Sequence, residues 1–209
     1  MPLTVARIAE ELGLSGIKTR TAEICTDKLL MKEYLHDAGM PVPWFSAVDS
    51  VSQLRSLVLE RGLPLVLKPV DNRGARGVIR LTPEIDLNWA FNYAKKFSLS
   101  SRVMVEEFLS GPQYSTESIF IKGDSFTLGF CERNYEYLER FKPFIIENGG
   151  QQPAKIGDND KKSIIEVVEK ASKSLGISTG TTKGDMVLTD KIPKIIEIAP
   201  LNFGTGQNL

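Results

Sequence analysis

The sequence of 209 residues contains one histidine and only two cysteines. The lone His36 falls within an expected helix, so a histidine-based catalytic mechanism is not indicated. Cys25 and Cys131 stand far apart and match no metal-binding spacing. We therefore expect two reduced thiols, as is usual for a cytoplasmic protein.

The chain also lacks an excess charge and a long apolar run. Lys and Arg together number 26, as do Asp and Glu, so the formal net charge is zero. A neutral chain gives no argument for a nucleic-acid or membrane surface. No segment approaches the roughly 20 apolar residues of a membrane span, and the first residues lack the pattern of a signal peptide. We expect a cytoplasmic protein with neither nucleic acid nor a membrane as partner.

Helical and strand patterns alternate along the chain. Apolar residues at helical spacing predict a first helix that ends at Gly13 and a second that runs from an N-cap at Thr26 to about Ala38. Further helices are expected over residues 50–61, 82–97 and 158–175. Short apolar or alternating runs predict strands over residues 65–70, 78–81, 103–109, 114–122 and 126–133. A hairpin turn is expected at Gly123-Asp124.

Two strand-like segments near the end of the sequence, 183–188 and 194–199, each carry one carboxylate. If their hairpin is centred near Lys191, Asp185 and Glu197 lie opposite each other, with Cβ atoms roughly 4.5–5.5 Å apart. A register slip of one residue would place them on opposite faces. Opposed like charges destabilise a sheet, so the pair indicates either a bound cation or a proton shared between the carboxylates. Two carboxylates plus phosphate oxygens commonly hold Mg²⁺.

A lysine, Lys68, ends the apolar strand that precedes a glycine-rich loop at residues 71–77. A lysine is costly to bury unless it meets an anion, and a phosphate is a fitting partner. The context of strand, loop and strand differs from the strand, turn and helix of Walker and Rossmann loops. Such a loop is either a simple turn or a flap whose backbone N–H groups donate to phosphates.

Six motifs follow one another along the chain, namely Thr26-Asp27-Lys28, Leu67-Lys68-Pro69, the loop 71–77, Glu106-Glu107-Phe108-Leu109, Asp185 and Glu197. Their order resembles the ATP-grasp superfamily, above all its carboxylate–amine ligases and the ATP-binding halves of carbamoyl-phosphate synthases. The likeness covers about residues 3–204. It implies an α+β fold in which two lobes, each with an antiparallel sheet and helices, enclose a nucleotide cleft. The implied division is a remnant of a leading α/β domain at 1–25, a small lobe with the flap at 26–101, and a large, truncated or stand-alone lobe at 102–209.

The resemblance also assigns roles to residues. The two lysines hold phosphates, the loop covers them, and Glu106 reaches the adenine amino group. The three residues after Glu106 form a hinge against the adenine edge, and Gln113 stands where the family often has a ribose-binding glutamate. Asp185 and Glu197 match the ligands of Mg²⁺, or of Mn²⁺ in its place. The implied ATP-binding residues are Lys28, Lys68, Arg73, Gly74, Ala75, Gly77, Glu106, Glu107, Phe108, Leu109 and Gln113.

The sequence departs from the family at the last motif, which commonly reads Glu-x-Asn-Pro-Arg. Ala199 stands at the asparagine and Leu201 at the arginine, so no catalytic residue is assigned, and Asn202 is a candidate substitute ligand. The implied activity is that of an ATP-dependent ligase that activates a carboxylate as an acyl phosphate for attack by an amine. Two alternatives stay open, a non-catalytic or partial nucleotide-binding module and a bicarbonate-activating ATPase. The expected partners are the small carboxylate and amine substrates, and a second copy or another subunit that supplies missing segments.

Overall fold

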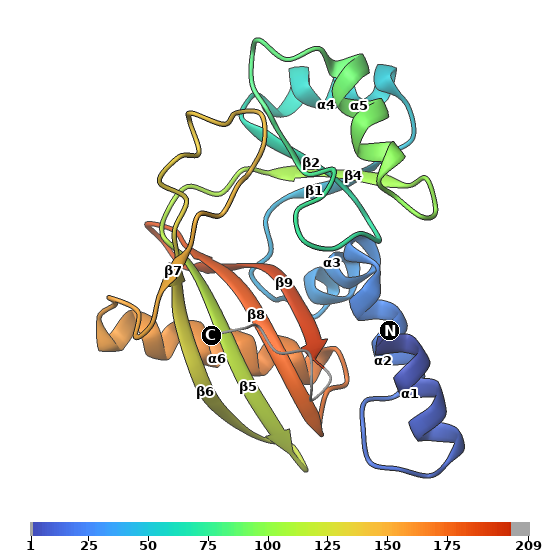
Figure 1. The fold of residues 1–209 in the computed structure, drawn as a ribbon, viewed down its shortest axis with the longest axis vertical. Helices are drawn as coiled ribbons and strands as arrows, with labels where there is room; N and C mark the ends of the chain where they lie inside the picture. Colours follow the sequence, from blue (N-terminus) through green and yellow to red (C-terminus); the bar gives the residue numbers. More distant parts are fainter. Residues whose placement is uncertain (1, 202–209) are drawn as a thin grey trace. The chain divides into compact units, whose positions relative to one another are not determined.

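The computed structural model describes residues 2–201, which form two compact units (Figure 1). The first unit contains residues 2–42, 110–133 and 150–201, and the second contains 43–109 and 134–149. Each unit has its own antiparallel sheet and its own apolar core, which confirms the predicted α+β class. In the described part of the chain, no helix combines the length and the apolar character that crossing a bilayer requires.

The two compact units divide the chain differently from the lobes expected at 26–101 and 102–209. Residues 26–42 pack with the first unit, and residues 102–109 and 134–149 pack with the second. The reason is that a strand near residue 105 pairs inside the sheet of the second unit, between two of that unit's other strands.

The sheet of the first unit has five strands in the order β7-β6-β5-β8-β9, and every neighbouring pair is antiparallel. Its strands are β5 (Gln113–Ile121), β6 (Asp124–Arg133), β7 (Gly150–Gln151), β8 (Gly180–Leu188) and β9 (Pro193–Leu201). The long helix α6 (Asp158–Ser174) lies along one face of this sheet (Figure 1). Its buried residues Ile164 and Val168 share a core with Phe120 of β5 and Met186 of β8.

Three helices complete the first unit, namely α1 (Pro2–Glu11), α2 (Thr19–Thr26) and α3 (Lys28–Asp37). The predicted N-cap at Thr26 was wrong, because Thr26 ends α2, a helix that the sequence pattern did not indicate. Asp27 caps α3 instead, and its carboxylate accepts a hydrogen bond of 3.0 Å from the backbone N–H of Leu30. This cap fixes the first turn of α3, the turn that carries Lys28.

The second unit has a four-stranded sheet in the order β1-β4-β2-β3. Its strands are β1 (Phe45–Val48), β2 (Leu65–Pro69), β3 (Ile79–Leu81) and β4 (Val103–Glu107), and its helices are α4 (Val51–Arg61) and α5 (Leu87–Lys96). Leu54 of α4 and Ala90 and Ala94 of α5 are fully buried in the core with strand residues such as Leu67. Both helices therefore bury their apolar side chains in one core with the sheet.

The segment 134–149, which connects β6 to β7, packs in the second unit and is called the excursion below. It covers β3, because Ile79 forms a bridge with Phe144 and the N–H of Arg80 donates to the carbonyl of Pro143 at 2.8 Å. The Phe144 ring meets the ring of Trp89 on α5 edge to face, with centroids 6.3 Å apart. The excursion thus closes the β3 edge of the sheet with backbone and aromatic contacts.

Two predicted boundaries were wrong for local reasons. The fourth predicted helix begins at Leu87 rather than near residue 82, because the Asp86 carboxylate caps it by accepting from the N–H of Asn88 at 2.8 Å. The β5–β6 turn lies at Lys122-Gly123, where φ is 52° and 96°. Two central residues with positive φ are what a tight hairpin prefers, and Asp124 already pairs with β5. The strand β1 was not predicted.

Candidate functional site

The two carboxylates of the β8–β9 hairpin lie opposite each other, as the sequence predicted. Asp185 and Glu197 are direct partners in the ladder. Both side chains lie at the surface of the unit but are largely shielded, with 14% and 29% exposure. Because paired residues share a face, both carboxylates project from the sheet face opposite to α6. We call this face the open face.

Asp185 is surrounded by groups that stabilise its negative charge. Its Oδ2 atom lies 3.0 Å from Nη1 of Arg133 and 3.3 Å from Nζ of Lys183. Its Oδ1 atom accepts a hydrogen bond of 2.9 Å from the hydroxyl of Ser115. These three neighbours of Asp185 were not predicted from the sequence. Lys183 could have been found from the two-residue period of a strand, whereas Ser115 and Arg133 become neighbours only through the strand order.

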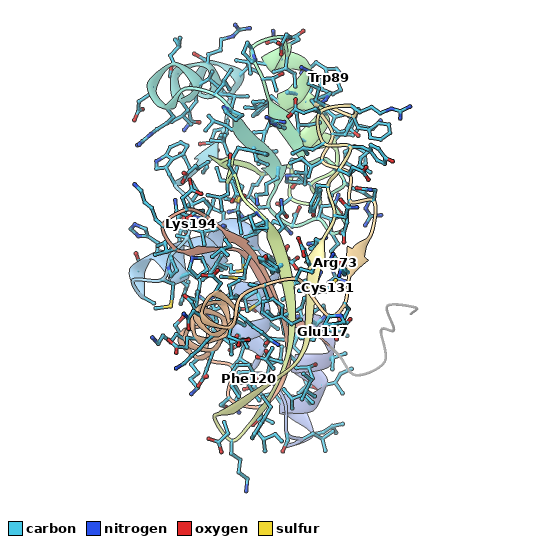
Figure 2. The ribbon with its side chains drawn as sticks, turned by 90° about the vertical axis from the view of Figure 1, so that its left-hand side faces the viewer. Arg73, Trp89, Glu117, Phe120, Cys131 and Lys194 are labelled. Carbon is cyan, nitrogen blue, oxygen red and sulfur yellow. The ribbon has the colours of Figure 1, made fainter. Side chains whose placement is uncertain are left out.

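The open face continues beyond Asp185 with more polar residues of β5 and β6. Glu117 pairs with Lys183, and Ser115 pairs with both Asp185 and Cys131. Figure 2 labels Glu117 and Cys131 on these neighbouring strands. A Cβ atom on Gly129 would stand 3.1 Å from the Cβ of Glu117, so a glycine gives that carboxylate room. Opposite charges therefore alternate across the open face, which keeps several ionised groups in one small area.

Lys28 is the predicted phosphate-binding lysine of the first unit, and it reaches Glu197. Its Nζ atom lies 3.5 Å from Oε1 of Glu197, and the lysine side chain is only 14% exposed. Burial together with the nearby charge of Glu197 raises the pKa of the Cys25 thiol to about 12. A thiol that stays protonated is a poor nucleophile and a poor metal ligand, so Cys25 is a packing residue of this site.

Lys68, the second predicted lysine, pairs with Glu106 in the interior of the second unit. The two side chains form an ion pair and each is 6% exposed. They lie on adjacent strands, two rungs apart in the ladder, because Lys68 pairs with Met104 and Glu106 pairs with Val66. A diagonal spacing of this kind is within reach of a long side chain. The predicted anion for Lys68 is thus supplied at least in part by the chain itself.

The predicted flap is a turn that joins two paired strands, β2 and β3. The backbone has positive φ at Gly74, Ala75 and Gly77, with values of 66°, 56° and 80°. A Cβ atom at Gly77 would stand 2.8 Å from Cβ of Phe97, so close packing as well as φ requires glycine there. Arg73 and Arg76 are both exposed on this turn. The turn therefore presents two guanidinium groups and irregular backbone amides to solvent.

Asp71 anchors the base of this turn. Its carboxylate accepts hydrogen bonds from the Ser98 hydroxyl at 2.8 Å and from the backbone N–H groups of Leu99 and Ser100 at 3.0 and 2.7 Å. Partial burial is the largest single influence and opposes ionisation, but the hydrogen bonds from Ser100, Ser98 and Leu99 together outweigh it and lower the pKa of Asp71. The ionised carboxylate thus ties the loop after β2 to the end of α5.

The predicted hinge follows β4 and is supported on both sides. The backbone N–H of Glu107 donates to the carbonyl of Trp44 at 2.9 Å. The guanidinium of Arg80 stacks over the ring of Phe108, with 4.5 Å between its Cζ atom and the ring centroid, and it also pairs with Glu139 of the excursion. Leu109 is the last residue of the second unit in this stretch. An aromatic ring held by a guanidinium is a rigid surface on which a planar group can pack.

The predicted site residues therefore form two sets, one in each unit. The first unit holds Lys28, Gln113, Asp185 and Glu197. Gln113 begins β5, where it pairs with Arg133 on one side and Val187 on the other. The second unit holds the remaining residues, which are Lys68, Arg73, Gly74, Ala75, Gly77, Glu106, Glu107, Phe108 and Leu109. Asn202, the candidate substitute ligand, lies outside the described residues.

Metal-binding capacity within residues 2–201 is limited to pairs of ligands. No group of three or more His, Cys, Asp or Glu side chains in this part of the chain could hold a metal ion. The opposed pair of Asp185 and Glu197 offers carboxylate oxygens of the kind that Mg²⁺ prefers. Because Mg²⁺ keeps waters and shares its ligands with substrate phosphates, a pair of protein carboxylates is sufficient for it. The donor set therefore fits a phosphate-bound Mg²⁺ ion.

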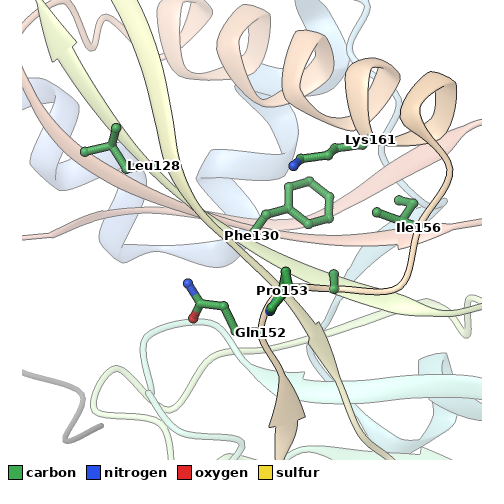
Figure 3. Close-up of a pocket in the computed structure, with 7 residues that line it drawn as sticks. Leu128, Phe130, Gln152, Pro153, Ile156 and Lys161 are labelled. Carbon is green, nitrogen blue, oxygen red and sulfur yellow. The ribbon is translucent and has the colours of Figure 1, made fainter.

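A small hollow lies on the other face of the same sheet, at its β6 edge (Figure 3). Its volume is about 140 Å³, and it lies under the segment that leads into α6. Phe130 forms its floor and pairs with the buried Thr116, on the face opposite to Asp185. The Nζ atom of Lys161 lies 5.6 Å from the Phe130 ring centroid. The hollow is thus separate from the polar groups of the open face.

This fold and this arrangement of acidic and basic residues define an ATP-grasp domain. The chain belongs to that family, whose domain model matches residues 25–205. It is 25% identical to the alanine–anticapsin ligase of Bacillus subtilis (strain 168) over 93% of this chain and 45% of that protein. It is 28% identical to protein y4rH of Sinorhizobium fredii over 94% of this chain and 40% of that protein.

The solved structures lead to the same family. The L-amino acid ligase of Bacillus licheniformis superposes with a TM-score of 0.79 and 26% identity, over 97% of this chain and 47% of that chain. This chain is thus similar to an alanine–anticapsin ligase and to an L-amino acid ligase. The chain spans less than half the length of these three relatives.

Proposed function

We propose that this domain binds MgATP and uses it to activate a small carboxylate as an acyl phosphate, which an amine then attacks. The observation that carries the proposal is the ladder pair of Asp185 and Glu197, with Lys28 held against Glu197. A bound Mg²⁺ ion would neutralise charge on the phosphate oxygens. The ligase relatives support the choice of reaction.

The chain's own residues would act through positioning and charge. Lys28 of the first unit, and Lys68 with the 73–77 turn of the second, supply cations and backbone amides for phosphates. Glu106 orients the Lys68 ammonium group by their ion pair. The hinge of residues 107–109 offers backbone and the Phe108 ring to adenine, and Gln113 offers an amide to ribose.

Arg133 and Lys183 extend this assignment. Both cations lie within 3.3 Å of Asp185 on the open face. A phosphate or carboxylate oxygen that shared a metal ion with Asp185 would come within reach of one or both. We therefore propose that Arg133 and Lys183 stabilise the charge of the transferring phosphoryl group. The family commonly uses an arginine for this role, at the position that Leu201 occupies here.

Calorimetric titration with ATP, with and without Mg²⁺, tests the binding half of the proposal. We expect binding that Mg²⁺ strengthens in the wild-type domain, and a loss of this Mg²⁺ dependence in Asp185→Asn. The matched control is Asp190→Asn, because Asp190 is exposed in the turn of the same hairpin. Equal Mg²⁺ dependence in all three proteins would place the metal elsewhere and contradict the assignment.

Ala199 and Leu201 at the last motif favour a second candidate, a domain that binds nucleotide without turnover. Phosphate release from ATP separates the two candidates. Release that depends on a mixture of amino acids supports the ligase, and release that depends on bicarbonate supports a bicarbonate-activating ATPase. Tight MgATP binding without release under either condition supports the non-catalytic module.

A further inference from the structure

One extra residue in β9 creates the opposition of the two carboxylates. The ladder of the β8–β9 hairpin runs in regular steps from Leu188↔Pro193 to Met186↔Ile195. A regular next step would pair Asp185 with Ile196. The observed partner is Glu197, so Ile196 is an additional residue on β9, in the manner of a β-bulge.

The bulge decides the face on which Glu197 lies. In a regular ladder Glu197 would pair with Gly184, and a shift of one residue moves a side chain to the other face of the sheet. Gly184 lies on the buried face, because a Cβ atom there would stand 2.8 Å from Cγ2 of Val168 on α6. Without the bulge, the carboxylate of Glu197 would therefore point toward the apolar core and away from Asp185.

Helix α3 and the residues that follow it contact the backbone of β9 on both sides of the bulge. The Nζ atom of Lys32 donates to the carbonyl of Ile195 at 2.8 Å. The N–H of Ile195 donates to the carbonyl of Pro41 at 2.8 Å, and the N–H of Ile198 lies 3.4 Å from the sulfur of Met31. Within residues 2–201, β9 is an edge strand of its sheet, so these contacts engage backbone groups that no other strand of this part of the chain pairs with.

Lys32 is the unusual member of this group. Its side chain is fully buried, at 0% exposure. Burying an ammonium group is costly, and an apolar residue of similar shape would fill the same space without that cost. Lys32 follows Lys28 by one helical turn, so the two lysines share a face of α3. One of them contacts the side chain of Glu197, and the other contacts the backbone two residues before it.

We propose that Lys32 is a positioning residue that maintains the β9 bulge and thereby holds Glu197 opposite Asp185. The effect of Lys32 on metal binding rests on the proposed function, whereas its effect on strand register does not. The two parts can therefore be tested separately.

The register is tested on Lys32→Met without nucleotide or metal, by nuclear Overhauser effects between backbone protons of β8 and β9. We expect the Asp185–Glu197 contacts to be lost and Asp185–Ile196 contacts to replace them. Leu35→Ala is the control, because Leu35 is also fully buried on α3 but its side chain has no group that could donate a hydrogen bond to the β9 backbone. This variant should be less stable than the wild type but should retain the Asp185–Glu197 contacts. A folded Lys32→Met protein that retains them overturns the proposal.

Deletion of Ile196 provides a rescue test. Without this residue the ladder can run regularly while Asp185 still faces Glu197, so a lysine that serves the bulge is no longer needed. We expect the protein that combines Lys32→Met with the deletion to fold and to show the Asp185–Glu197 contacts. This result is expected even if Lys32→Met alone does not fold. A combined variant that remains unfolded, or that lacks these contacts, would show that Lys32 serves the core independently of the bulge and would overturn the proposal.

The consequence for the site is tested with MgATP. Lys32→Met should lose the Mg²⁺ dependence of nucleotide binding, and the deletion should restore it in the combined variant. Absence of Mg²⁺-dependent binding in the wild type would contradict the proposed function and leave the register result unaffected. A shifted register with unchanged Mg²⁺ dependence would show that Glu197 is not a metal ligand and would overturn this part of the inference.

Discussion

The buried ion pair of Lys68 and Glu106 determines how strongly mutation of either residue destabilises the second unit. Lys68 and Glu106 form an ion pair with both side chains 6% exposed, so each is the other's compensation in a low-dielectric interior. From the sequence alone, Lys68 is expected to meet a phosphate. Its pairing with Glu106 could not be predicted, because it depends on the adjacency of β2 and β4 and on a diagonal contact between them.

We predict that Lys68→Met lowers the free energy of unfolding by about 3–5 kcal/mol, because it leaves the Glu106 carboxylate buried without its cation. The double variant Lys68→Met/Glu106→Leu should be markedly more stable than the single variant. Urea denaturation measures the free energy of unfolding of both variants. Nucleotide titration of the double variant then measures how the loss of Lys68 affects binding in a protein that buries no uncompensated Glu106 carboxylate. Equal stabilities for the single and double variants would show that the pair does not carry this energy.

The pH dependence of stability should contain a contribution from Asp71. Its pKa is lowered in the folded protein, so its stabilising effect is fully present above the unfolded value of about 3.9 and is lost as the pH falls through the lower folded value. Asp71→Asn should therefore be less stable than the wild type near neutral pH, with a difference that shrinks as the pH falls below the unfolded value and through the lower folded value. Urea midpoints across this range provide the measurement. A difference that stays constant with pH would contradict the role of the charge.

At the scale of elements, the sequence predicts most of the fold because the two periodicities are clear. The β8–β9 hairpin, the pairing of Asp185 with Glu197 and the long α6 were all predicted. The pairing was predicted from an assumed centre near Lys191. The three rungs nearest the turn centre half a residue earlier, and the extra residue Ile196 shifts the centre of the rungs beyond it to Lys191. Arg133 and Ser115 could not be predicted as neighbours of Asp185, because strand order is a property of the whole sheet.

The contact of α6 with the sheet depends on a missing side chain at Gly184. A Cβ atom there would stand 2.8 Å from Val168 Cγ2 and 2.9 Å from Thr116 Oγ1. Gly184→Ala should therefore cost about 1–3 kcal/mol of stability through overpacking. Gly16→Ala is the control, since the nearest atom to a Cβ there is the Cβ of Ala9 at 3.7 Å, an ordinary contact distance. Thermal denaturation of the two variants should give a clear difference, and equal melting temperatures would contradict the close packing of α6 on β8.

At the scale of the whole molecule, two separate cores should give two separately measurable stabilities. Leu54 is fully buried in the core of the second unit, and Leu54→Ala should cost about 2–5 kcal/mol. We expect faster amide hydrogen exchange in β2, β4 and α5 and in the excursion, because the excursion packs on β3.

Exchange in α6 and β8 is the internal control of this experiment, because both elements belong to the other core. Their exchange rates should stay close to those of the wild type. An equal increase in both units would mean that the two cores open together, which would contradict their independence.

The excursion of residues 134–149 has a consequence for dividing this protein into fragments. It packs on β3, yet in the sequence it lies between β6 and β7 of the other unit. A gene fragment that encodes residues 43–109 would thus yield a sheet in which the edge strand β3 is uncovered. The N–H of Arg80 would lose its hydrogen bond to Pro143, and Ile79 would lose its bridge to Phe144. A minimal version of the second unit requires residues 134–149 to be joined back by a designed linker. No single cut in the gene separates the two units.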